Sequence, residues 1–491
     1  MLNKKQNAML PNKGINKISE LKTCFTHSWV EPDFIKSSLK SFTFSSLCKA
    51  LGPFKLRGYS FESIFTMLLS LPFLGIETVN SMYNHYLIEQ TTIKKDVFYR
   101  MKNNPGTCWR VILWLFACKF RDVINDKSTL DSGSPRCFIV DDSTLPKSGR
   151  LIEKVSYVWD HVSRRSILGF KLLVAGYWDG TSFIPLDFSL HREKGKNKER
   201  PCGLKKKYYK KQHRSRREKG SHSYDRSKEA DNSKIESAIN MFRKAISQGF
   251  KIEYALMDSW FTCEAFIDAV KRVKYQTVHL IGMYSTPKTL FNYCTRQLTH
   301  SQIRNTLGKP KRCRKLHLYY QEVSVEYKGY SLKLFYSKQG ANGKWHVILT
   351  TDTDISFIKM IEIYQIRWSI EVFFKESKQL LNLGRCQSNN FDAHIADITM
   401  TMIQYILISM RYRFDTYETK WGVFKHISEQ TIQYRLSERL WGLFIELLTV
   451  IEKLFDGIDE MELIEKIMSD DEAFEIICRI LPIKAQFQTA A

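Results

Sequence analysis

The chain has 491 residues, 43% of them hydrophobic and 13% aromatic, which excludes a small peptide and a wholly disordered chain. Two to four domains are expected at this length. The 75 lysines and arginines outnumber the 51 aspartates and glutamates, and the formal net charge of +24 favours a polyanionic partner.

The cysteines and the apolar stretches exclude further classes of protein. The eleven cysteines are scattered and never spaced C-x2-C, so we expect reduced thiols in the cytoplasm and no disulfide framework or zinc site. No apolar segment typical of a secretion signal follows the basic N-terminus. The longest apolar stretches, around 63–76 and 398–410, fall short of the roughly 20 residues of a membrane span, so buried helices are predicted.

Charge divides the chain into three segments. Residues 1–130 contain 18 basic and 9 acidic side chains, residues 131–385 contain 47 and 25, and residues 386–491 contain 10 and 17. This pattern indicates that the first two segments contact a polyanion and the acidic third contacts protein, with chance variation of surface charge as the alternative.

Residues 40–130 carry mainly helical patterning, and a short helix is predicted to end before Pro105. Four basic residues crowd this short helix: Lys94, Lys95, Arg100 and Lys102. It is suited to a DNA groove as a recognition helix, but a lone basic helix can equally be a solvated face. Both interpretations stay open.

After residue 134 the sequence pattern changes from mainly helical to rich in predicted β-strands. The pattern predicts three strands, a helix, a strand and a second helix, at residues 137–143, 164–180, 181–193, 233–249, 252–260 and 261–273. A hairpin turn joins the second and third strands, and the whole reads as a mixed α/β layer.

The steepest basic excess is residues 192–219, with 14 basic and 3 acidic side chains. We call this segment the basic arm. Its composition predicts a loop outside the core, in which Tyr208 and Tyr209 could stack on bases while lysines neutralise phosphates. A solvated loop without a dedicated role is the alternative.

Strand-like alternation returns over 278–343, with the clearest hairpin at 316–338, and a buried strand follows at 344–352. Asp354 is expected to open a long helix that runs to about Leu381. The remainder of the chain reads as helical.

Three acidic residues have a setting suited to metal chemistry. Asp142 and Asp258 end apolar strands, and Glu371 lies on the long helix. Carboxylates at the rigid edge of a sheet can converge, and Mg²⁺ prefers oxygen ligands, so three acids can hold two Mg²⁺ ions, with Mn²⁺ as a substitute. Paired ions can activate a water or a 3′-hydroxyl for phosphodiester displacement. Asp141 is the alternative to Asp142, because strand alternation lets only one of two neighbours join the cluster.

The long helix places four residues on one stripe. Tyr364, Arg367, Glu371 and Lys378 are spaced i, i+3, i+7 and i+14, which brings them onto one helical face. This composition suits a metal ligand, Glu371, flanked by phosphate contacts from Arg367 and Lys378. A row of intrahelical ion pairs would have the same spacing.

The same four residues form the pattern Y-x2-R-x3-E-x6-K, which resembles the signature of DDE transposases of the bacterial insertion-sequence type that cut and paste through a DNA hairpin. In that family the first acid is a strand-end aspartate followed by Ser or Thr, as in VDDST, which favours Asp142. The second is another strand-end aspartate, as in LMDSW. The resemblance is clearest over residues 135–385.

The resemblance implies an α/β, ribonuclease H-like catalytic core over 131–385, interrupted by a β-rich insertion at about 275–340. Residues 1–130 would be a helical region that binds DNA ends, and residues 386–491 a helical, acidic region suited to dimerisation. Catalytic and metal-binding roles fall on Asp142, Asp258 and Glu371. DNA contacts fall on Tyr364, Arg367 and Lys378, and Trp345 would hold a flipped base.

The expected function is that of an insertion-sequence transposase, a metal-dependent endonuclease and polynucleotidyl transferase. It would bind terminal inverted repeats of double-stranded DNA as a homodimer in a synaptic complex, cleave them, and join the 3′-ends to target DNA. The alternatives are a metal-dependent nuclease without strand transfer and a non-catalytic DNA-binding derivative.

Overall fold

The computed structural model describes residues 34–44, 55–56, 58–83, 93–127, 133–340, 342–414, 418–454, 460–473 and 476. Contacts divide the chain into two compact units. The first comprises Met1–Phe98 together with Tyr417–Ala491, and the second comprises Tyr99–Thr416.

The first unit is helical in its described residues. The N-terminal part supplies α2 (Phe34–Ser41), the short strands β1 (Lys55–Leu56) and β2 (Tyr59–Ser60), α4 (Phe61–Ser70), η1 (Pro72–Leu74) and α5 (Val79–Met82). The C-terminal part supplies α16 (Lys420–Leu454) and α17 (Glu460–Ser469). Helix α4 begins where Ser60 Oγ accepts a hydrogen bond from Ser63 N. The rings of Phe73 in η1 and Phe424 in α16 lie 5.3 Å apart, so the described N-terminal and C-terminal parts of this unit are in contact.

The second unit is built on one large mixed sheet that contains every described strand from β3 to β14. Its first half runs in the order β6–β5–β3–β7–β8. The bounds are β3 (Cys137–Pro146), β5 (Arg165–Trp178), β6 (Phe183–His191), β7 (Tyr254–Met257) and β8 (His279–Met283). Strand β5 is antiparallel to both β3 and β6, whereas β7 and β8 run parallel to β3. The predicted mixed α/β layer is therefore present.

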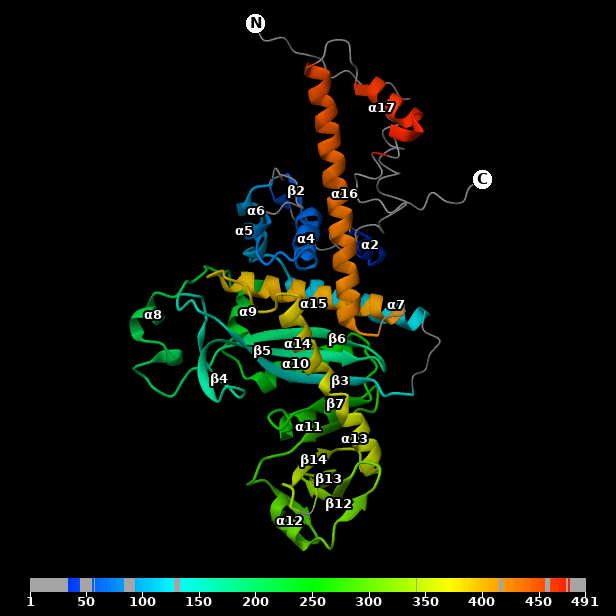
Figure 1. The fold of residues 1–491 in the computed structure, drawn as a ribbon. Helices are drawn as coiled ribbons and strands as arrows, with labels where there is room; N and C mark the ends of the chain where they lie inside the picture. Colours follow the sequence, from blue (N-terminus) through cyan, green and yellow to red (C-terminus); the bar gives the residue numbers. More distant parts are fainter. Residues whose placement is uncertain are drawn as a thin grey trace. The chain divides into compact units, whose positions relative to one another are not determined.

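Helices cover both faces of this half of the sheet (Figure 1). On one face, α10 (Lys234–Ser247) packs Phe242 against Phe138 of β3. On the other, α14 (Trp368–Leu380) contacts β3 and β6, and its Phe373 ring lies 5.6 Å from Phe183. Helix α11 (Glu264–Lys271) follows β7 and packs on β8. The central strands are consequently buried from both sides.

The sheet continues through the second half of the predicted β-rich region. The bounds are β9 (Leu290–Tyr293), β10 (Arg296–Thr299), α12 (His300–Thr306), β11 (Lys311–Cys313), β12 (Leu318–Tyr327), β13 (Tyr330–Gln339) and β14 (His346–Thr350). Strand β14 pairs antiparallel with β8, which joins this region to the core strands. The predicted hairpin is confirmed as β12–β13. Strand β8 lies inside the predicted insertion range of 275–340, yet it pairs parallel with the core strand β7.

The long helix expected from Asp354 to about Leu381 is interrupted, which corrects that prediction. Helix α13 (Phe357–Gln365) begins at Ser356, whose side chain accepts from Lys359 N, and α14 begins only at Trp368. Ile366 and Arg367 keep right-handed dihedral angles, but the backbone bonds across them run from residue i to i−3. A locally tightened 3₁₀ turn therefore separates the two helices.

Two helices near the ends of the second unit complete its core. Helix α7 (Trp109–Lys127) and α15 (Phe391–Phe414) pack against each other and against β6. Helix α15 is the one helix among the described residues that is long and apolar enough to cross a membrane. Most of its apolar window is buried within the protein, as in the core helix predicted for this stretch.

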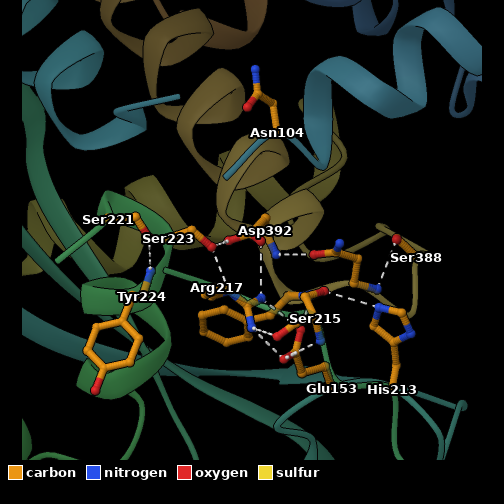
Figure 2. A network of polar contacts seen from close by, with 12 residues as sticks. Asn104, Glu153, His213, Ser215, Arg217, Ser221, Ser223, Tyr224, Ser388 and Asp392 are labelled. Carbon is orange, nitrogen blue, oxygen red and sulfur yellow. Dashed lines mark hydrogen bonds and ion pairs between the residues drawn. The ribbon is translucent and has the colours of Figure 1, made fainter. Parts of the chain in front are cut away.

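The basic arm is folded, not an extended loop. Strand β4 (Ser156–Asp160) pairs with β5, and the arm runs past it through η2 (Pro201–Gly203) and α8 (Lys206–Lys210) towards α9 (His222–Glu229). Figure 2 shows how its end is fixed: Arg217 donates to both oxygens of Glu153 and to Asp392 of α15. Ser223 donates to the same Asp392. Because these charges are buried and paired, the arm has one defined path.

Candidate active site at the ends of two parallel strands

The end of β3 carries two adjacent aspartates that face opposite sides of the sheet. Alternation along a strand places Asp141 and Ser143 on one face and Asp142 on the other. The parallel pairing of Val140 with Met257 then sets Asp141 beside Asp258, the first residue after β7. Two carboxylates from neighbouring strands consequently meet at one edge of the sheet.

Arg367 joins this edge to helix α14. Its guanidinium contacts Asp141 Oδ2 at 2.9 Å and also forms an ion pair with Glu371. Both acids and the arginine are largely shielded from solvent. The Arg367 guanidinium therefore links Glu371 to Asp141. The prediction had grouped Glu371 with Asp142.

Asp142 is held by lysines on the opposite face. It forms ion pairs with Lys234, at the start of α10, and with Lys171 of β5, the latter at 3.5 Å. Burial alone would raise the pKa of Asp142, but Lys234 and Lys171 together lower it below its usual range. Asp142 is thus an ionised partner of two cations.

The electrostatics of Asp141 differ. Burial and the neighbouring Asp258 carboxylate raise the pKa of Asp141 to about 7, although Arg367 opposes the shift. Burial also raises the pKa of Asp258, with a smaller contribution from the Asp142 carboxylate, against hydrogen bonds from the backbone N–H groups of Trp260 and Phe261. Two buried carboxylates that repel each other in this way have the character of a cation site.

Tyr364 and Lys378 lie on either side of this acidic edge. Tyr364 Oη donates to the carbonyl of Met257 at 3.2 Å, directly before Asp258. Lys378 Nζ donates to Ser143 Oγ at 2.7 Å, on the same face of β3 as Asp141. Burial lowers the pKa of Lys378, and Asp160 partly offsets this. All four residues of the sequence pattern therefore reach the ends of β3 and β7 despite the break in the helix.

Trp345 lies at the start of β14, which runs antiparallel to β8, so it shares the sheet edge at which β7 and β8 end. Its ring is half-buried, with Lys338 Nζ 5.0 Å and the Arg304 guanidinium 5.5 Å from the ring centre. Trp345 thus lies at the same edge of the sheet as Asp258, but none of its ring contacts is with the acids.

The four basic residues of the predicted short helix differ in their exposure and in their partners. Helix α6 spans Lys95–Lys102, and Lys94 is exposed just before it. Lys95 Nζ donates to Asn80 Oδ1 at 2.7 Å, and Arg100 is half-buried. Lys102 pairs with Asp397 of α15 at 2.7 Å. Burial opposes the charge of Lys102, but Asp397 outweighs it and raises the pKa. Lys102 therefore has a structural role within the second unit.

Sequence reasoning missed several residues around the acids. Lys171 and Lys234 reach Asp142 from separate elements, and the Trp260 ring lies 4.9 Å from Lys234 Nζ. Trp260 and Trp368, each close in sequence to a predicted acid or cation, are 59% and 62% exposed. In the sequence, these two tryptophans could have been found from their positions shortly after Asp258 and Arg367. The lysines resemble ordinary surface lysines until the fold brings them together.

Within the described residues, no three Asp, Glu, His or Cys side chains are close enough to enclose a metal ion. Asp141 and Asp258 are neighbours, and the Arg367 guanidinium pairs with both Asp141 and Glu371. The donor set consists of hard carboxylate oxygens, which suits divalent cations such as Mg²⁺ or Mn²⁺.

Comparison with known proteins assigns this part of the chain to a family. A family model described as a transposase DDE domain matches residues 132–407, which is more than half of the chain and contains every acidic residue named above. No curated protein sequence matches the chain.

Proposed function

The chain belongs to the transposase DDE domain family, and from this premise we propose that it is the transposase of an insertion sequence. It binds the terminal inverted repeats of its element, cleaves the DNA, and joins the freed 3′-hydroxyls to target DNA. The observation that carries the proposal is the meeting of Asp141, Asp258, Arg367 and Glu371 at one sheet edge.

The topology of the second unit supports a ribonuclease H-like core. Three antiparallel strands, β6, β5 and β3, are followed in the sheet by two strands parallel to β3, with α10 and α11 as the connecting helices. The third acid arrives on a later helix, α14, after the β-rich insertion. The ends of β3 and β7 supply the neighbouring acids Asp141 and Asp258.

We assign the acidic triad to Asp141, Asp258 and Glu371. Enzymes of this family generally use divalent metal ions, and we propose two Mg²⁺ ions, with Mn²⁺ as a substitute. When bound, the ions activate a water or 3′-hydroxyl and stabilise the leaving oxygen of the phosphodiester. Asp141, Asp258 and Glu371 would hold the ions, and in this structure the Arg367 guanidinium pairs with Asp141 and Glu371 in their place.

The cations and aromatic residues near the triad fit a DNA backbone. Lys378 lies beside Ser143, and Arg367 can move from carboxylate to phosphate, since its planar guanidinium binds both in the same way. Tyr364 orients the end of β7, and Trp345 is placed to hold an extruded base. Lys94, Lys95 and Arg100 would contribute to recognition of the DNA ends. A homodimer in a synaptic complex, acting on cytoplasmic DNA, is part of the same proposal.

Cleavage and joining of the element's own ends test this function. We expect the full chain with Mg²⁺ to nick and join a DNA duplex that carries its inverted repeat, and a chelator to abolish both steps. Glu371→Gln should abolish cleavage while binding of the duplex remains within about twofold. Cleavage without joining would favour the nuclease alternative, and cleavage by Glu371→Gln would refute the triad.

A further inference from the structure

A cavity of about 950 Å³ lies between strand β4 and the first half of the basic arm. Its wall on the strand side includes Tyr157 and Trp159, and its wall on the arm side includes Lys196, Arg200 and Lys205. None of the acids of the candidate active site lines it. Its size would accommodate one or two nucleotides.

The wall on the arm side is preformed. Cys202 N donates to Lys194 O at 2.8 Å and Gly203 N to Arg200 O at 2.9 Å, which closes a tight turn. Gly203 has a φ of +75°, and a Cβ there would lie 2.6 Å from Tyr157 Cβ, so only glycine permits this approach. The buried Cys202 and Leu204 side chains fix the turn against the protein. A ligand would therefore meet an existing hollow and not a disordered loop.

The charge of the cavity is strongly positive. Four cations line it, namely Arg150, Lys196, Arg200 and Lys205, against one carboxylate, Glu193. Glu193 is already engaged, because both its oxygens accept from the backbone N–H of Trp159. Among the described residues, none of the four cations forms an ion pair, in contrast to neighbouring Lys206, which pairs with Glu199. Their charges are available for an anionic ligand.

Aromatic rings accompany these cations. Trp159 is 43% exposed, and the Tyr208 ring, which also lines the cavity, lies 5.0 Å from the Arg150 guanidinium. The exposed Trp159 ring and the half-buried Tyr157 and Tyr208 rings, beside cations without ion pairs, match the two halves of a nucleotide, since a base stacks on a ring and a phosphate pairs with a cation. A duplex keeps its bases paired and offers the rings nothing to stack on.

We propose that this cavity is a second DNA site, which takes an unpaired nucleotide strand with its bases against Trp159 and Tyr157 and its phosphates against Arg150 and Arg200. The proposal rests on the proposed function only in taking DNA as the partner. Trp159 directly precedes Asp160, whose carboxylate acts on Lys378 of the candidate active site. Because neighbouring side chains of a strand face opposite sides, a DNA strand that leaves the acids past Lys378 and Asp160 would cross the sheet edge at β4 to reach Trp159 and the cavity.

The test measures binding of a fluorescently labelled 15-nucleotide oligo(dT) to the full chain in EDTA by fluorescence anisotropy. Removing one stacking ring costs roughly 1–3 kcal/mol, so Trp159→Ala should weaken binding by about tenfold or more, and Trp159→Phe should retain most of it. Trp421→Ala removes another exposed tryptophan, from α16, and should leave binding unchanged. Arg200→Gln should weaken binding and reduce its salt dependence by about 0.7 in logarithmic slope.

Three outcomes would overturn the proposal: unchanged oligo(dT) binding by Trp159→Ala, an equal loss in Trp421→Ala, or an equal loss of binding to a 15-base-pair duplex. The last result would show a basic surface for duplex DNA. Thermal unfolding of each variant separates loss of the site from loss of the fold, and Trp159→Phe provides the folded control. Binding of oligo(dT) in EDTA requires no cleavage or joining, so failure of the transposase proposal would leave this result intact.

Discussion

Two neighbouring carboxylates at the end of β3 have opposite surroundings because a strand turns successive side chains to opposite faces. Asp141 faces α14 and shares Arg367 with Glu371, whereas Asp142 faces α10 and pairs with two lysines. The same residue type thus has a raised pKa at one position and a lowered pKa at the next. On the Asp141 side, three carboxylates including Asp258 surround one arginine, whereas Asp142 is matched by two lysines.

Replacing each aspartate in turn tests this assignment. Asp141→Asn should reduce Mg²⁺-dependent cleavage more than about 100-fold, because loss even of residues outside the ligand shell of a metal costs about 10–100-fold. Asp142→Asn should retain cleavage within about tenfold and mainly lower stability, since it leaves the buried Lys171 without a charged partner. Single-turnover cleavage and urea unfolding of both variants give the comparison. The reverse order of activities would assign catalysis to Asp142.

At the scale of elements, the position of Asp258 at the sheet edge depends on the close approach of β8 to the turn that follows β7. Gly282 of β8 lies against the turn after Asp258, where a Cβ would come within 2.0 Å of Thr262 Oγ1. Thr262 is buried and donates through that oxygen to the carbonyl of Asp258. Because Gly282 has no side chain, Thr262 has room to make this hydrogen bond, which helps to fix the position of Asp258.

We expect Gly282→Ala to destabilise the protein by about 1–3 kcal/mol and to reduce cleavage, because Thr262 must shift. Gly308→Ala is the matched control, since a Cβ at Gly308 meets no atom within 4 Å. Chemical denaturation measures the stability of each variant, and the cleavage assay is run well below the unfolding transition. An equal effect of both substitutions would mean that crowding of Thr262 is not the cause.

Helices α13 and α14 show what the helical spacing of residues in the sequence can and cannot predict. The spacing of Tyr364, Arg367, Glu371 and Lys378 predicted a common stripe, and all four do reach one edge of the sheet. The 3₁₀ turn at Ile366 and Arg367 was not predictable, because both residues are compatible with an uninterrupted helix. Packing of α13 near β8 and of α14 on β3 decides where the helix tightens.

At the scale of the whole molecule, stability in acid should depend on histidines buried as neutral rings. Burial lowers the pKa of His394 on α15 to about 3, and Lys147 acts in the same direction. Between that value and about 6.5, the unfolded chain binds a proton at this site that the folded chain does not. Stability is therefore fully present above pH 6.5 and decreases as the pH falls, by about 1.4 kcal/mol per pH unit.

Comparison of the free energy of unfolding at pH 6.5, 5.5 and 4.5 checks this expectation. His394→Gln should lower stability at neutral pH but make its dependence on pH shallower by about 1.4 kcal/mol per unit. His161→Gln, which changes an exposed residue, should leave the slope unchanged. Equal slopes for the wild type and His394→Gln would show that His394 does not titrate as proposed.

The sequence alone determined most strands and helices of the second unit and the acids and cations of the signature, since strand and helix periods, turn residues and the spacing of the signature are local properties. The hairpins β5–β6 and β12–β13 and helix α10 follow directly from such patterns. Only the tertiary structure distinguished the surroundings of Asp141 from those of Asp142, because they depend on which face α14 covers. It also decided that the basic arm folds beside β4, since the partners of Arg217 are 64 and 175 residues away in the chain.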